Sequence, residues 1–80
     1  MLSKYHVVVR LGRGLLAAEI AELRARRNGS ISHYEMHGED VVVVSLYAAS
    51  SSTAIETAEI QVQRATGLTV VSVRVLTWRL

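Results

Sequence analysis

The stretch KYHVVVRLGRGLLAAEIAELRARRNG, residues 4–29, decides the fold because its hydrophobic period changes within it from two to about 3.6. Its first eight residues alternate as a β-strand does, with Tyr5, Val7, Val9 and Leu11 on one face and His6, Val8 and Arg10 on the other. Residues 14–27 have helical spacing instead, and we expect Leu16, Ile20 and Leu23 to face the sheet. The stretch therefore predicts a strand followed by a helix.

Glycines lie at both ends of this predicted helix. Gly12 and Gly14 precede it, and we expect them to permit a tight corner between strand and helix. Asn28 and Gly29 follow it, and either residue adopts the left-handed conformation that ends a helix.

The second half of the chain carries two more strands and another helix. Residues 30–36 and 41–48 are expected to pair as a hairpin around Gly38, and the second of them is apolar on both faces. The next helix has a capping box of Thr53 and Glu56, or a cap at Ser51 or Ser52, and it ends at Gly67. Its predicted buried stripe is Ile55, Ala58, Val62 and Ala65, with Ile60 on the opposite side.

The last segment, residues 68–80, is a long β-prone strand. The complete order is strand, helix, strand, strand, helix, strand. Two right-handed strand-helix-strand units in this order give a four-stranded antiparallel sheet with both helices on one face. We therefore predict a single α+β domain over residues 1–80, a ferredoxin-like βαββαβ sandwich.

This fold leaves one face of the sheet without helices, and the last strand is apolar on both faces. Its alternation places Val71, Val73 and Val75 on one face and Leu68, Val70, Leu76, Trp78 and Leu80 on the other. Exposed apolar patches usually mark interfaces, and a two-fold homodimer buries one with a single self-complementary surface. We expect a homodimer whose interface contains Ile60, Leu76, Trp78 and Leu80. The alternative is a tail that folds back over its own sheet.

Composition limits the class of protein. The chain has 80 residues, a net charge of +2 and no cysteine, which excludes disulfides, thiolate metal sites and cysteine nucleophiles. No signal peptide and no apolar run long enough to span a membrane is present, so a cytoplasmic protein without a membrane partner is expected. Eight of the nine basic residues are arginine, a skew typical of a high-GC bacterium or its phages.

The sequence offers no catalytic constellation. It contains no nucleophile elbow and no pair of carboxylates spaced for acid-base chemistry, so we expect no enzymatic activity and no cofactor. His33, Glu35 and His37 share one face of their strand and could in principle hold a divalent metal. Because they flank a hairpin turn, solvent-exposed histidines are the preferred interpretation, and we predict no metal site.

The corner LGRG, residues 11–14, matches neither a phosphate-binding loop nor a dinucleotide fingerprint. An anion could still bind at the start of the first helix beside Arg13, although a plain structural corner is the preferred interpretation. Nucleic acid is not the expected partner. RNA-binding domains of this fold stack bases on aromatic residues of the two central strands, whereas Tyr5 and Tyr47 lie at opposite ends of theirs.

The segment LGRGLLAAEIAELRARRNGSIS, residues 11–32, resembles the first turn and helix of ACT domains, whose turn has the form DRPGLLAEIA. The matching positions are Gly14, Leu15, Leu16, Ala17, Ile20 and the turn at Asn28, Gly29, Ser30 and Ile31. ACT domains are small ferredoxin-like modules that bind amino acids and regulate enzymes, and they commonly pair. The resemblance implies a small ligand held at Gly12, Arg13, Gly14 and Leu15.

Two functional hypotheses follow. The first is a non-enzymatic, homo-oligomeric interaction or regulatory protein that binds a partner protein, such as an accessory protein of a phage or a high-GC bacterium gripping a host protein. The alternative is an ACT-like domain that binds an amino acid or other small ligand at the first strand-helix corner.

Overall fold

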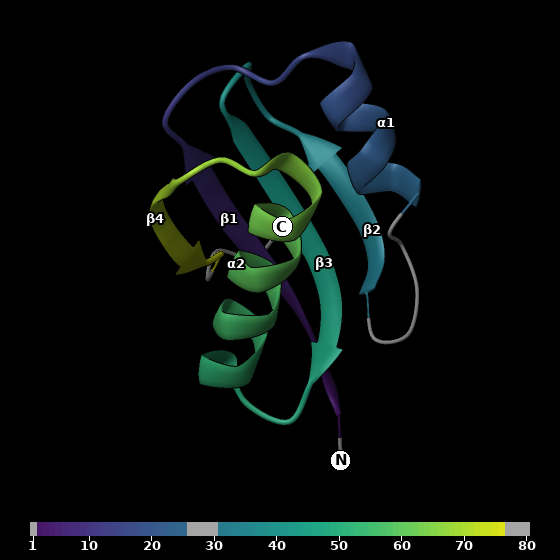
Figure 1. Ribbon diagram of the computed structural model, residues 1–80. Helices are drawn as coiled ribbons and strands as arrows, with labels where there is room; N and C mark the ends of the chain where they lie inside the picture. The colour runs from purple at the N-terminus through teal and green to yellow at the C-terminus, as the bar shows by residue number, and fades with distance from the viewer. Residues whose placement is uncertain (1, 26–30, 77–80) are drawn as a thin grey trace.

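The computed structural model describes residues 2–25 and 31–76, which form one four-stranded antiparallel sheet and two helices (Figure 1). The elements in chain order are β1 (Ser3–Leu11), α1 (Ala17–Ala25), β2 (Ile31–Met36), β3 (Val41–Ala48), α2 (Ser51–Thr66) and β4 (Val70–Val75). The strand order across the sheet is β2-β3-β1-β4. The α+β, ferredoxin-like βαββαβ fold predicted from the sequence is confirmed.

The register of the strands fixes which side chains share a face. Val7 on β1 lies opposite Val44 on β3, and Val9 lies opposite Val73 on β4. These residues point toward the helices, where α2 packs across β1, β3 and β4 and α1 lies beside α2 near β2 (Figure 1). Val7, Val9 and Val44 are completely buried, which stabilises the fold by roughly 1.5–3 kcal/mol per side chain.

Helix α1 begins later than expected, at Ala17. The N–H groups of Glu19 and Ile20 donate to the Leu16 carbonyl, so Leu16 is the residue that caps the helix and not part of its first turn. Its side chain is 63% exposed, and the expectation that it faces the sheet is wrong. Leu23 is buried as predicted, while the expected end of this helix at Asn28 and Gly29 lies outside the described residues.

Helix α2 is capped by Ser50, and not by the residues that the sequence pattern favoured. The Ser50 hydroxyl oxygen accepts a hydrogen bond from the Thr53 N–H at 3.2 Å, which satisfies one of the unpaired donors at the helix start. At the other end Gly67 has a φ of 71°, as expected for a left-handed C-cap. Of the predicted stripe, Ala58 and Val62 are completely buried, and Ile55 and Ala65 are half-buried against the core.

Strand β4 departs from simple alternation at a bulge. Arg10 lies opposite Ser72 but Leu11 lies opposite Val70, so Val71 is an extra residue on β4 and is 62% exposed. The bulge turns Val70 to the helix side, where Val73 and Val75 also pack against the core. The prediction that Val70 shares a face with Leu76 is therefore wrong, and the helix-free face of β4 carries fewer apolar side chains than expected.

Candidate functional site

The face of the sheet that no helix covers is called the open face here, and the pairing register defines its members. Strand β1 contributes Lys4, His6, Val8 and Arg10, and β3 contributes Val41, Val43, Ser45 and Tyr47. Strand β2 and the turn after it contribute His33, Glu35 and His37. Strand β4 and the residue after it contribute Ser72, Arg74 and Leu76. Apolar residues occupy the middle of this surface and charged residues surround them.

Charge is distributed unevenly between the two sides of the sheet. All seven acidic residues of the chain lie in the described part, and Glu35 alone is on the open face. The same face carries the cations Lys4, Arg10 and Arg74. The other described charged side chains lie on the helices, in the corner before α1 or in the β2–β3 turn. The acidic ones are Glu19, Glu22, Glu39, Asp40, Glu56 and Glu59, and the basic ones are Arg13, Arg24 and Arg64. With three cations and one carboxylate, the open face is basic.

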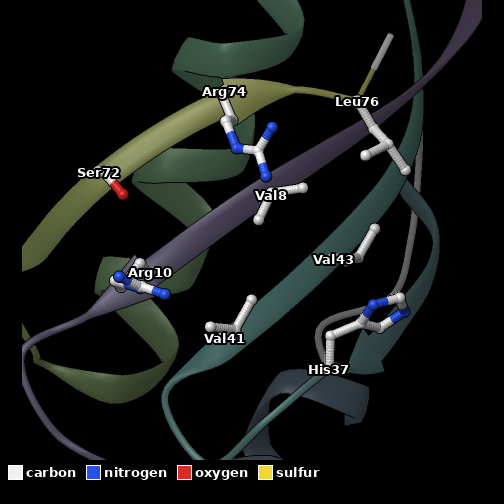
Figure 2. A pocket seen from close by; sticks show the side chains of 8 residues that line it. All are labelled: Val8, Arg10, His37, Val41, Val43, Ser72, Arg74 and Leu76. Carbon is white, nitrogen blue, oxygen red and sulfur yellow. The ribbon is translucent and has the colours of Figure 1, made fainter. Parts of the chain in front are cut away.

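A hollow of about 470 Å³ lies over β1 and β4 on the open face, within the size range of ligand-binding pockets. Its lining is Val8, Arg10, His37, Val41, Val43, Ser72, Arg74 and Leu76. In Figure 2 the Arg74 guanidinium lies above Val8, and the Arg10 side chain extends toward Val41. No acidic residue lines this hollow, and neither guanidinium has a hydrogen-bond or ion-pair partner among the described residues.

A second hollow, of about 360 Å³, adjoins the first on the β2 side. All three histidines of the chain line it, together with Lys4, Glu35, Val43, Ser45 and Leu76. His6 Nδ1 lies 2.8 Å from the Ser45 hydroxyl oxygen, and His37 Nε2 lies 3.2 Å from a carboxylate oxygen of Glu35. His33, Glu35 and His37 share a face as predicted, yet no three His, Asp or Glu side chains of residues 2–25 and 31–76 are grouped so that they could hold a metal ion.

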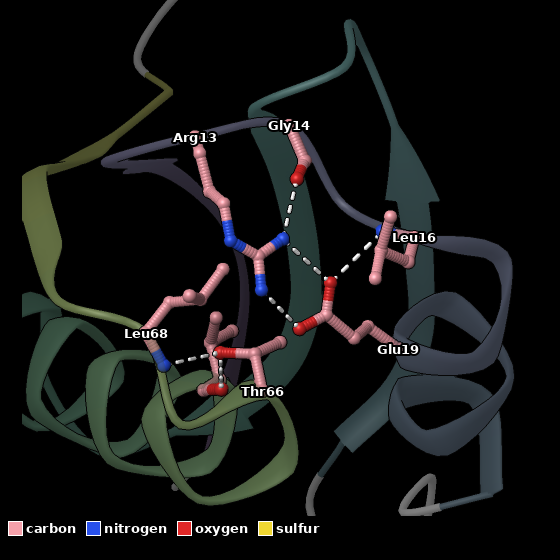
Figure 3. A network of polar contacts seen from close by, with 7 residues as sticks. Arg13, Gly14, Leu16, Glu19, Thr66 and Leu68 are labelled. Carbon is pink, nitrogen blue, oxygen red and sulfur yellow. Dashed lines mark hydrogen bonds and ion pairs between the residues drawn. The ribbon is translucent and has the colours of Figure 1, made fainter.

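At the corner before α1, Arg13 and Glu19 form a bidentate ion pair (Figure 3). Arg13 Nη1 and Nη2 donate to the two carboxylate oxygens of Glu19 at 2.9 and 2.8 Å, and the Leu16 N–H donates to the same carboxylate at 2.8 Å. The Arg13 hydrogen bond lowers the pKa of Glu19, with a further contribution from the Leu16 N–H, and the same contact raises the pKa of Arg13. The chain itself thus supplies an anionic group at this helix start.

The two glycines of the corner are not equivalent. Neither Gly12 nor Gly14 has a positive φ, so neither is needed for a left-handed turn. A Cβ at Gly14 would lie 3.1 Å from the Cβ of Glu39, because the Leu15 N–H donates to the Glu39 carbonyl and draws the corner against the β2–β3 turn. A side chain at position 14 would require Glu39 to shift by a few tenths of an ångström, whereas Gly12 has room for a side chain.

Of the four residues predicted to form a dimer interface, the two that the structure describes lie on opposite sides of the sheet. Ile60, 37% exposed, lies on α2, on the helix side of the sheet. Leu76 lines the hollows of the open face, on the opposite side. Trp78 and Leu80 lie outside the described residues.

Sequence reasoning did not single out Arg10, Ser72 or Arg74 as site residues. Arg10 and Arg74 are separated by most of the chain and meet only because β1 pairs with β4. A signal was present: Arg10 shares its alternation with His6 and Val8, and the predicted strand order makes the first and last strands neighbours.

Of the described tyrosines, Tyr47 alone lies on the open face. Tyr5 packs against the core on the helix side, whereas Tyr47 is exposed with the Lys4 ammonium 5.9 Å from its ring centre. In the part of the chain that the structure describes, no helix is both long and apolar enough to cross a membrane. Comparison with family models, curated proteins and solved structures gave no match to this chain.

Proposed function

We propose that the protein acts by binding and not by catalysis, and that its open face receives an acidic segment of a partner protein. The observation that carries this proposal is the charge segregation: Lys4, Arg10 and Arg74 surround an apolar floor on which Glu35 is the one carboxylate. Complementary charge steers association and selects partners, and it acts more strongly over a surface with little competing charge of the other sign.

A protein segment fits this surface better than a nucleic acid. Proteins that bind single strands through a sheet stack successive bases on aromatic side chains. On the open face Tyr47 is the aromatic residue of the described strands, and it lies at the end of β3 away from Arg10. The floor is instead made of Val8, Val41 and Val43, which suits aliphatic side chains of a peptide.

The homodimer stays a prediction, and the charges of the open face bear on its geometry. Two open faces brought together by a two-fold axis would bring together two surfaces that each carry three cations and one carboxylate. Like charges at an interface cost free energy, so we propose that a dimer uses another surface and leaves the open face accessible. Light scattering at tens of micromolar tests the dimer, and a strictly monomeric species would contradict it.

The ACT-like alternative also stays a prediction. A ligand carboxylate at the corner would compete with Glu19 for both nitrogens of the Arg13 fork. The open face, whose arginines are unpaired among the described residues, is therefore the preferred site. Thermal-shift screening against amino acids tests the alternative, and stabilisation that is lost in Arg13→Ala would favour the corner.

The proposal is tested by charge reversal with a matched control. We expect a short Glu-rich peptide to bind the wild-type protein and the R10E/R74E variant to bind it at least about tenfold more weakly, because each charge-assisted contact contributes about 1.5–3 kcal/mol. The control variant R24E/R64E makes the same change of net charge on the helices. Equal loss of affinity in both variants would show attraction by net charge alone and would contradict a site on the open face.

A further inference from the structure

We propose that the hollow between Arg10 and Arg74 is a subsite for a phosphate monoester, carried by a phosphorylated side chain of the acidic partner segment. This subsite rests on the function proposed above, since it names the group of the partner that enters the first hollow.

The two arginines are positioned to act on one group. Arg10 lies opposite Ser72 and Arg74 lies opposite Val8, so the two arginines are diagonal neighbours on adjacent strands. Long side chains at diagonal positions on one face are within reach of each other. Both line the same hollow, in which Figure 2 shows Arg74 above Val8 and Arg10 beside Val41. A single anion in the hollow can therefore contact both.

Nothing in the described lining neutralises this pair of cations. The hollow has no carboxylate, and the hydroxyl of Ser72 and the imidazole of His37 add further hydrogen-bonding groups from β4 and from the turn after β2. Like charges that line one hollow repel each other. A bound dianion removes that repulsion, which favours a ligand of charge near −2 over one of charge −1.

Hydrogen-bonding capacity points to the same class of ligand. Each guanidinium offers a planar fork of N–H donors, and one carboxylate is satisfied by one fork. A phosphate monoester has three terminal oxygens and a charge of about −1.5 to −2 near pH 7, so it accepts from both forks at once. A phosphodiester of a nucleic acid has a single charge and two such oxygens, which matches the pair less well.

The floor of the hollow strengthens these contacts. Val43 is buried, and Val8, Val41 and Leu76 are half-buried under the charged rim. Apolar side chains beneath an ion pair reduce the access of water and so reduce the screening of charge. The volume of about 470 Å³ accommodates a phosphorylated side chain together with its neighbours on the peptide.

The experiment compares three peptides of one acidic sequence that carry phosphoserine, glutamate or serine at the central position. We expect the phosphoserine peptide to bind the wild-type protein on the order of tenfold more tightly than the glutamate peptide. The variant R10K/R74K keeps both charges and loses both forks. It should retain the glutamate peptide and lose the preference for phosphoserine, whereas the control R24K/R64K should retain both.

The outcomes separate this inference from the proposed function. Equal affinity for the phosphoserine and glutamate peptides would overturn the subsite and leave the acidic-segment proposal standing. Failure of all three peptides to bind would overturn both. Two further probes test the source of the phosphate. Inorganic phosphate should compete only weakly with the phosphoserine peptide. Tighter binding of a single-stranded oligonucleotide than of the phosphoserine peptide would also overturn the subsite. Circular dichroism of each variant confirms that the fold is retained.

Discussion

Arg10 and Arg74 project from neighbouring antiparallel strands into one hollow, and neither has a partner of opposite charge among the described residues. Most of the acidic residues lie on the helices or at the turns of the sheet. Like charges on neighbouring strands repel each other, and the binding role proposed for the open face would offset that repulsion.

We expect the substitution Arg74→Gln to stabilise the protein slightly at low ionic strength. It removes the repulsion by Arg10 and breaks no ion pair of the described residues, and the gain should be about 0.5 kcal/mol or less in the free energy of unfolding. Urea unfolding at low and high salt measures it, and the gain should disappear at high salt. Arg64→Gln, on α2, is the control. A clear destabilisation by Arg74→Gln would contradict the unpaired state of this side chain.

The ion pair of Glu19 with Arg13 should make the stability depend on pH in the acid range. Since the pKa of Glu19 is lowered in the folded protein, its contribution is complete above the ordinary glutamate value of 4.5 and is lost as the pH falls through the lower folded value. We expect the stability difference between wild type and Glu19→Gln to be constant near neutral pH and to shrink below 4.5. Thermal unfolding across this range measures the difference. A difference that persists unchanged into strong acid would contradict the role of the carboxylate.

Gly14→Ala and Gly12→Ala should have unequal effects on stability. The new Cβ at position 14 would lie 3.1 Å from the Glu39 Cβ and force it to shift by a few tenths of an ångström, so we expect a loss of about 1 kcal/mol in the free energy of unfolding. At position 12 the nearest atom is the Thr69 carbonyl oxygen at 3.9 Å, an ordinary contact, so the change should be within about 0.5 kcal/mol. Chemical denaturation of both variants tests this. Equal losses would mean that the corner needs glycine for its backbone conformation and not for close packing.

The fold was predictable because the hydrophobic period of each segment is clear in the sequence. The alternation around Val7 and Val9, the helical spacing up to Leu23 and the stop at Gly67 each belong to one element and depend on local chemistry. The errors lie where one local pattern competes with another. Ser50 caps α2 although three further hydroxyl residues follow it, and the bulge at Val71 shifts the alternation of β4 by one residue.

The open face was harder to predict because its residues meet only through long-range pairing. Arg13 was a candidate ligand-binding residue because it precedes a helix, yet its guanidinium forms an ion pair with Glu19. Arg10 and Arg74 look like ordinary surface residues until β1 is placed beside β4. The absence of acidic residues around them is a property of the surface and not of any short segment.

The most direct test of the open face as the binding surface is to follow the arginine Nε–H signals of ¹⁵N-labelled protein while the Glu-rich peptide is added. The account predicts that the signals of Arg10 and Arg74 shift together and saturably, while those of Arg24 and Arg64 stay in place. Shifts confined to Arg24 and Arg64, with Arg10 and Arg74 unchanged, would contradict it.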